Sequence, residues 1–173
     1  LKTQTIGSFS TAGQSDLCYA KRKIYTRLRT ATTMDIYVSD VDDLSATVLA
    51  YSSSIITGAS YFNLVFDGQF LYEGYGIDNG ATLDFYLRKF SFNADYSLNL
   101  DATSTSYANI STTSSPTGQL VYANNSIYYH FGVSSGANAR IHKVNKSSLS
   151  SEANDTFGDP SGCTLADGHN LLS

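Results

Sequence analysis

The stretch DGQFLYEGYGIDNGATLDFYLRKF, residues 67–90, contains two runs rich in alternating apolar residues, separated by a turn with asparagine and glycine. Alternation with a period of two predicts β-strands, and a short Asn/Gly turn between two such runs predicts an antiparallel hairpin. Similar pairs of runs occur at 24–41 and at 127–144. The chain therefore repeats one β-structured unit three times.

Each unit contains more strands than this hairpin. The predicted first strands are 16–20, 62–66 and 119–123, the second strands are 24–30, 71–77 and 127–133, and the third strands are 35–41, 84–90 and 138–144. Fourth strands are predicted at 46–52 and 96–103, and the last unit shows no clear candidate.

The spacing of the units indicates the class of repeat. Ile24 precedes Leu71 by 47 positions, and Leu71 precedes Ile127 by 56. Propeller blades have four antiparallel strands and about 40–50 residues, and they tolerate loop insertions. We therefore predict an all-β fold, a β-propeller of four-stranded antiparallel blades, with three blades and the start of a fourth. The predicted segments are an N-terminal extension or closing strand (1–14), three blades (15–58, 59–117 and 118–160), a Ser/Thr-rich loop within the second blade (103–117), and the start of blade four (161–173).

The middle unit also resembles known repeats. The runs LYEGY (71–75) and DFYLRKF (84–90) are similar to extracellular β-propeller repeats of the SBBP or YVTN kind. Residues 78–83, DNGATL, resemble a degenerate Asp-box hairpin, in which Leu83 replaces the usual aromatic residue and Gly76 the leading serine. The resemblance implies the propeller fold alone, because propellers host enzymes, lectins and scaffolds.

Four glycines occupy matched positions in the last two units. Gly80 and Gly136 lie between second and third strands, where a tight hairpin requires a positive φ. Gly74 and Gly132 lie within second strands. We expect these two glycines to allow close packing between blades or a bend in the strand.

The last residues repeat the beginning of a unit, and three blades do not close a ring, since about four is the smallest number. One alternative is a longer propeller, of which this chain is a part; we favour it. The other is a fourth blade in which residues 2–9 pair with 162–173. A disulfide between Cys18 and Cys163 would favour the small closed ring, because it requires Cα atoms within about 7 Å.

Composition and charge argue against two classes of partner. The formal net charge is −4, whereas phosphate binding requires clustered Lys and Arg, so no nucleic acid is expected. The basic stretch 21–29 is predicted to be an ordinary solvent-exposed strand edge. No apolar run approaches the ~18 residues of a membrane span. The start at Leu1, without a signal peptide, predicts a processed protein or a fragment.

Asp40, Asp42 and Asp43 form an acidic cluster that could bind a hard cation. The aligned segments of the other units contain no such cluster, and aspartate favours turns through its own hydrogen bonds. A turn is therefore the preferred interpretation and a metal site the alternative. No cofactor is predicted.

No catalytic residue is predicted either. The sequence contains no G-x-S-x-G motif, and its three histidines, His130, His142 and His169, share no spacing. Glycoside hydrolysis uses two carboxyl groups, but Glu152 is the only glutamate besides Glu73, which is expected to face solvent or the channel. The arginines that a sialidase would gather around its substrate have no common register; they are Arg27, Arg29, Arg88 and Arg140.

Four N-glycosylation sequons begin at Asn109, Asn124, Asn145 and Asn154, and all fall in predicted turns or loops. We predict N-linked glycans there. The tract 103–117 is either a carrier of O-linked glycans or a plain flexible loop.

These features predict a non-enzymatic module of an extracellular or cell-surface glycoprotein, serving adhesion, surface assembly or protein–protein interaction. Its expected partners are other protein chains, or the remainder of its own chain, bound through unpaired strand edges. One alternative is the propeller part of a glycan-processing hydrolase whose catalytic residues lie outside this segment. Another is a two-sheet β-sandwich.

Overall fold

A computed structural model describes residues 16–111, 116–133 and 139–157. Every regular element within these ranges is a β-strand. The strands are β1 (Asp16–Ala20), β2 (Lys23–Arg29), β3 (Thr33–Asp40), β4 (Val48–Ser54), β5 (Ala59–Phe66), β6 (Leu71–Asp78), β7 (Thr82–Phe92), β8 (Leu98–Thr103), β9 (Asn109–Ser111), β10 (Pro116–Ala123), β11 (Ser126–Val133), β12 (Ala139–Val144) and β13 (Ser151–Phe157).

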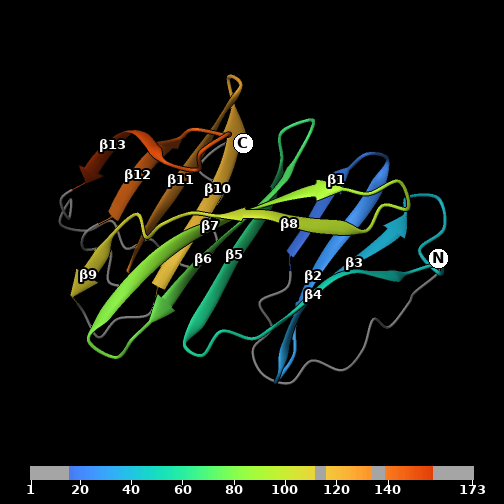
Figure 1. Cartoon of the computed structure of the whole chain (residues 1–173), viewed down its shortest axis with the longest axis horizontal. Helices are drawn as coiled ribbons and strands as arrows, with labels where there is room; N and C mark the ends of the chain where they lie inside the picture. Colours follow the sequence, from blue (N-terminus) through green and yellow to red (C-terminus); the bar gives the residue numbers. More distant parts are fainter. Residues whose placement is uncertain (1–15, 112–115, 134–138, 158–173) are drawn as a thin grey trace.

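The strands form three antiparallel sheets that follow one another along the chain (Figure 1). Sheet 1 has the order β1–β2–β3–β4, sheet 2 the order β5–β6–β7–β8, and sheet 3 the order β10–β11–β12–β13. The short strand β9 pairs with the first residues of β7, while β8 pairs with the last residues of β7. The predicted all-β fold of four-stranded antiparallel sheets is therefore confirmed.

Tight turns connect the first two strands in sheets 1 and 3. Lys21 and Arg22 have φ angles of 52° and 63°, and Asn124 and Asn125 have angles of 48° and 58°. Two consecutive positive φ angles match the twist of a two-residue hairpin, and asparagine adopts them more readily than lysine or arginine. Gly80, between β6 and β7, has a φ of 86°, as predicted. The matching Gly136 lies outside the described residues.

Sheet 2 lies between the other two sheets (Figure 1), and β7 shows how its sequence serves both neighbours. Leu83, Phe85 and Leu87 belong to a buried cluster shared with sheet 3, whereas Phe90 belongs to one shared with sheet 1 and Phe92 packs against it. Odd and even positions of this strand therefore both carry apolar residues, because both faces of the sheet are covered.

The first strands of the three sheets are neighbours in space, since β5 contacts β1 on one side and β10 on the other. Each of these strands pairs with only one strand of its own sheet. The line β1–β5–β10 is thus the place where side chains of all three sheets meet, and the site described below lies along it.

The structure differs from three local expectations. The basic stretch 21–29 is not a solvent-exposed edge, because β2 is paired on both sides and Arg27 turns its side chain toward sheet 2. The tract 103–117 contains β9 and the start of β10, since backbone pairing holds these residues without an apolar pattern. The missing fourth strand of the last unit is β13, an edge strand with the sequence SEANDTF.

Candidate functional site

A β-bulge in β5 marks the point where the three sheets meet. The register of β5 against β6 shifts between Tyr61 and Leu64, so that Phe62 and Asn63 lie outside the regular ladder. A bulge leaves backbone groups without ladder partners, and in a buried strand these groups need other partners. Side chains supply them here.

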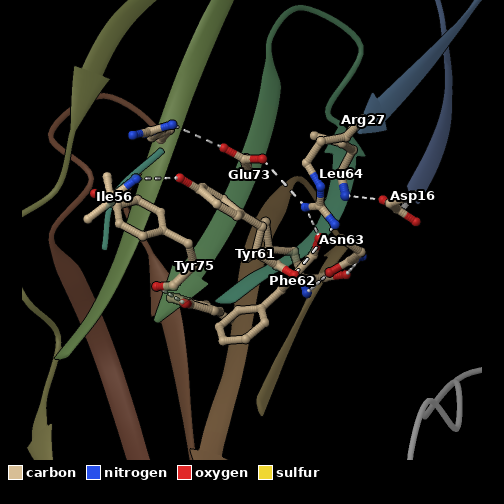
Figure 2. Close-up of polar contacts among 12 residues, drawn as sticks. Asp16, Arg27, Ile56, Tyr61, Phe62, Asn63, Leu64, Glu73 and Tyr75 are labelled. Atoms are coloured by element: carbon tan, nitrogen blue, oxygen red, sulfur yellow. Dashed lines mark hydrogen bonds and ion pairs between the residues drawn. The ribbon is translucent and has the colours of Figure 1, made fainter. Parts of the chain in front are cut away.

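Arg27 of β2 is the principal partner of the bulge (Figure 2). Its Nη1 donates to the carbonyl of Phe62 and to Oε1 of Glu73 at 3.4 Å, and its Nη2 donates to the carbonyl of Tyr61 at 3.4 Å. Glu73 lies on β6, and its Oε2 lies 3.5 Å from Nη1 of Arg88 on β7. One carboxylate is therefore held between guanidinium groups from two sheets.

Two further contacts join the neighbouring first strands (Figure 2). The carboxylate of Asp16 on β1 accepts a hydrogen bond from the N–H of Leu64. The side-chain amide of Asn63 accepts from the N–H of Leu120 on β10 at 2.5 Å and donates to its carbonyl at 2.7 Å. These hydrogen bonds connect the bulge in β5 to both flanking sheets. They are made by a backbone N–H and a side-chain amide that have no partner in the β5–β6 ladder.

The cluster of Arg27, Glu73 and Arg88, which we call the charge cluster, is closed to solvent, with exposed fractions of 2%, 0% and 6%. Burial raises the pKa of the Glu73 carboxyl, and the two guanidinium groups oppose that rise. Breaking a buried ion pair leaves an uncompensated charge, which is costly. The charge cluster therefore fixes how sheet 1 packs on sheet 2, and it has no access to a substrate.

This geometry corrects two predictions. Glu73 faces neither solvent nor a channel, and two of the arginines without a common register, Arg27 and Arg88, converge on it. Arg27 belongs to another sheet, so its approach depends on packing between units. The contact between Glu73 and Arg88 could have been predicted from the sequence, because these residues lie directly opposite each other and equally far from the β6–β7 turn.

A groove of about 370 Å³ runs along the first strands, with walls from β1, β5 and β10. Its lining includes Tyr19, Phe66 and Tyr122. Cys18 also lines the groove, and burial together with the nearby Asp16 raises the pKa of its thiol to about 11. A thiol with that pKa stays protonated at neutral pH and is a poor nucleophile. The groove therefore offers a contact surface, with no activated thiol.

The predicted acidic cluster forms the turn after β3. Oδ2 of Asp40 lies 2.7 Å from Nζ of Lys23, and its Oδ1 accepts from the N–H of Asp42 at 3.2 Å. Oδ1 of Asp43 accepts from the N–H of Ser45 at 3.0 Å. These are the bonds of an aspartate turn. Within the described ranges, no group of three or more His, Cys, Asp and Glu side chains is arranged to hold a metal ion.

The sequon asparagines differ in exposure. Asn109 in β9, Asn124 in the β10–β11 turn and Asn154 in β13 are exposed. Asn145 is partly buried, and its Oδ1 accepts from the N–H of Ser147 at 2.9 Å. Glycosylation of these residues stays a prediction.

The remaining candidates are the two cysteines and the three histidines, and the structure describes only some of them. Cys18 is a free thiol, and Cys163 lies outside the described residues, so their disulfide stays a prediction. His142 stacks on Phe131 inside the contact between sheets 2 and 3, with Nδ1 2.9 Å from Oγ of Ser151. His130 lies on β11, and His169 lies outside the described residues.

Sheet 1 exposes a face that its counterparts bury. Residues directly opposite one another across antiparallel strands share a face of the sheet. We use the term rear row for four such residues. In sheets 2 and 3 the rear row points toward the preceding sheet, and in sheet 1 it points away from sheet 2. The rear rows are Leu17–Thr26–Tyr37–Leu49 in sheet 1, Leu64–Glu73–Arg88–Thr103 in sheet 2, and Leu120–Tyr129–His142–Asn154 in sheet 3.

The leucine that begins each rear row shows the difference most clearly. Leu64 and Leu120 are 4% and 1% exposed, whereas Leu17 is 61% exposed. At the other end of the same row, Leu49 is 52% exposed. Sequence reasoning did not identify this surface, because alternation shows that a strand has an apolar face and does not show which sheet covers it.

Comparisons with known proteins bear on the fold. No family model matches the chain, and no curated protein matches its sequence. Among solved structures, the chain is similar to the β-propeller domain of Nup133 from Vanderwaltozyma polyspora, with a TM-score of 0.52 and 7% sequence identity. The similarity covers 83% of this chain and 47% of that chain, so this chain spans about half of that domain's length.

Within the described ranges, no helix is long and apolar enough to cross a membrane. The three sheets have the order and packing of propeller blades, and the structural similarity is to a propeller. The predicted start of a fourth blade lies outside the described residues, and the SBBP or YVTN class is not shown. The chain has the fold of a β-propeller built from four-stranded antiparallel blades, consistent with an incomplete ring.

Proposed function

We propose that this chain is a non-enzymatic module of an extracellular or cell-surface glycoprotein, and that it serves adhesion or surface assembly by binding other protein surfaces. The observation that carries the proposal is the exposure of Leu17, 61% against 4% and 1% for its counterparts Leu64 and Leu120. An apolar surface that the same fold covers elsewhere marks an interaction site.

The rear face of sheet 1 has the composition of an interface core. Leu17, Tyr19 and Leu49 are 61%, 58% and 52% exposed, and their side chains extend over strands at opposite edges of the sheet. Fully burying one such side chain stabilises a complex by about 1.5–3 kcal/mol. Aromatic side chains are enriched among the residues that contribute most to binding.

Two features support an extracellular location. Asn109, Asn124 and Asn154 begin sequons and are exposed, so an oligosaccharide transferase would find them accessible. The Asn124–Asn125 turn projects from the end of a hairpin, where a glycan would not disturb the packing between sheets. The low charged fraction of 15% also fits a partner that is a protein rather than a polyanion.

Adhesion is tested by coating inert beads with the full chain and measuring their binding to cultured cells and to one another. We expect binding that Leu17→Asp reduces at least tenfold and that Leu44→Asp leaves unchanged. Leu44 is a matched control, because it is 41% exposed and lies in the turn after β3, away from the rear row. Beads that bind nothing, or equal binding by both variants, would overturn the proposal.

The glycoprotein part is tested by secreting the chain from cultured eukaryotic cells and measuring its mass before and after treatment with peptide N-glycosidase F. We expect a decrease in mass on treatment, and the loss of one glycan in Asn124→Gln. Asn125→Gln removes a neighbouring asparagine and keeps the sequon, so it serves as the control. Retention in the cell without any glycan would contradict an extracellular location.

A further inference from the structure

Sheets 2 and 3 present the same residues on the faces that point away from sheet 1, which we call their front rows. The front row of sheet 2 is Val65–Tyr72–Lys89–Ala102, and that of sheet 3 is Val121–Tyr128–Lys143–Ala153. The four residue types agree in identity and in order. Two such faces should therefore accept the same kind of neighbour.

The front row of sheet 2 shows what that neighbour is. Tyr72 is fully buried, and Val65 and Ala102 pack against the core shared with sheet 3. The surface that covers this row is the rear face of sheet 3, whose rear row begins with Leu120. A front row of this type is thus made to contact a rear row that begins with leucine.

The front row of sheet 3 remains open among the described residues. Ala153 is exposed, the Lys143 side chain is 42% exposed, and Val121 and Tyr128 are partly buried, whereas Tyr72 in the front row of sheet 2 is fully buried. The rear row of sheet 1 begins with Leu17 and is also open among the described residues. The described part of one chain therefore carries an uncovered front row and an uncovered rear row, and each matches half of the contact already formed between sheets 2 and 3.

We infer that a second copy of this chain places the rear row of its sheet 1 on the front row of sheet 3, and that the reverse contact closes a ring of two chains. The interface is heterologous, because two different faces meet, and it closes when the rotation permits. The described ranges of two chains supply six sheets, within the usual range of about four to eight blades. This inference rests on the proposed function, because it names the partner of the same surface.

Analytical ultracentrifugation of the full chain tests the ring. We expect a species of twice the 18.7 kDa chain mass at micromolar concentration. Leu17→Asp on the rear row and Ala153→Arg on the front row should each weaken the dimer at least about 30-fold, the effect of losing one strong interface residue. Leu44→Asp is the matched control and should leave the dimer intact. Circular dichroism confirms that each variant is folded; both substituted residues are exposed.

Mixing the two variants distinguishes this ring from any other dimer. A Leu17→Asp chain keeps an intact front row, and an Ala153→Arg chain keeps an intact rear row, so the mixture forms one sound contact. We expect a mixed dimer at concentrations where each variant alone is monomeric. In a symmetric dimer that joins two rear rows, Ala153→Arg alone would dimerise as strongly as the wild type, and that result would overturn the inference.

The outcomes also separate this inference from the proposed function. The ring would be overturned if the wild-type chain were still monomeric at a concentration of about 100 micromolar. It would also be overturned if Leu17→Asp and Leu44→Asp dimerised equally strongly. If chain-coated beads still bound cells through Leu17, the adhesive function would stand with a different partner. If neither dimer nor bead binding occurred, both would fail.

Discussion

The two contacts between sheets solve the same packing problem with different chemistry. Where sheet 1 meets sheet 2, Arg27 extends from β2 toward Glu73 of β6. At the corresponding positions where sheet 2 meets sheet 3, Gly74 of β6 faces Tyr129 of β11. A charged pair in one contact is replaced by an aromatic ring against a glycine in the other.

The two contacts should respond differently to substitution, because one depends on apolar burial and the other on paired charges. The ring of Tyr129 packs among Phe62, Tyr107 and Phe131, so this contact is mainly apolar and aromatic. Burial of apolar area contributes stability in proportion to the area. A buried ion pair contributes little net stability when intact, but losing one partner exposes the cost of the remaining charge. The first contact should therefore be the more sensitive to a single substitution.

The largest effect is expected from Glu73→Ala, which leaves Arg27 and Arg88 buried without their carboxylate. The free energy of unfolding should fall by about 3–5 kcal/mol. Urea denaturation followed by circular dichroism measures it. As a control, the triple variant Arg27→Met, Glu73→Leu and Arg88→Met replaces all three charges with apolar groups and should recover most of the loss. A loss below about 1 kcal/mol in Glu73→Ala would remove the contrast between the contacts.

A smaller effect is expected from Gly74→Ala. A Cβ atom at this position would lie 3.0 Å from Cε2 of Tyr129, so the ring must move. We expect a loss of about 1–3 kcal/mol from overpacking, measured by the same denaturation. In a Tyr129→Leu background the added methyl group should cost much less. An equal cost in both backgrounds would show that the ring does not depend on the glycine.

Tyr129→Phe should have a weaker effect still, because it removes one hydroxyl and keeps the ring. That hydroxyl donates to the carbonyl of Tyr75 at 3.2 Å inside the second contact. We expect a loss of about 0.5–1.5 kcal/mol. Tyr122→Phe removes an exposed hydroxyl and should leave the unfolding free energy unchanged. If both variants behaved alike in thermal denaturation, the buried hydrogen bond would not contribute.

The smallest effect expected is a pH dependence located in the second contact. Burial lowers the pKa of His142, and the charge of Arg140 lowers it further. The unfolded chain therefore binds the proton more readily, so the contribution of His142 is present above pH ~6.5 and is lost as the pH falls through the lower folded pKa. Urea midpoints measured from pH 7.5 downward should decrease more steeply in the wild type than in His142→Gln. His130 also has a lowered pKa, so only the difference between the two chains reports on His142.

Several features of the fold could be predicted because they depend on neighbours along the chain. Strand β1 coincides with its predicted range, 16–20, and Gly80 adopts the positive φ that its hairpin requires. The expected packing role of Gly74 is confirmed by the ring of Tyr129. Gly132 differs, since its nearest neighbour is Ala139 of the adjacent strand in the same sheet. Strands without apolar alternation, β9 and β13, were missed because backbone pairing alone holds them.

The sequence by itself determined the repeated four-stranded unit, since alternation and turn residues act over a few positions and recur with each unit. The tertiary structure alone decided that Arg27 would reach Glu73, because these residues are 46 positions apart and belong to different sheets. It also decided which rear row would stay open: Leu17 and Leu64 begin equivalent rear rows with the same residue, but only Leu64 has a sheet in front of it among the described residues. Equal local patterns acquire different roles because burial depends on position in the array.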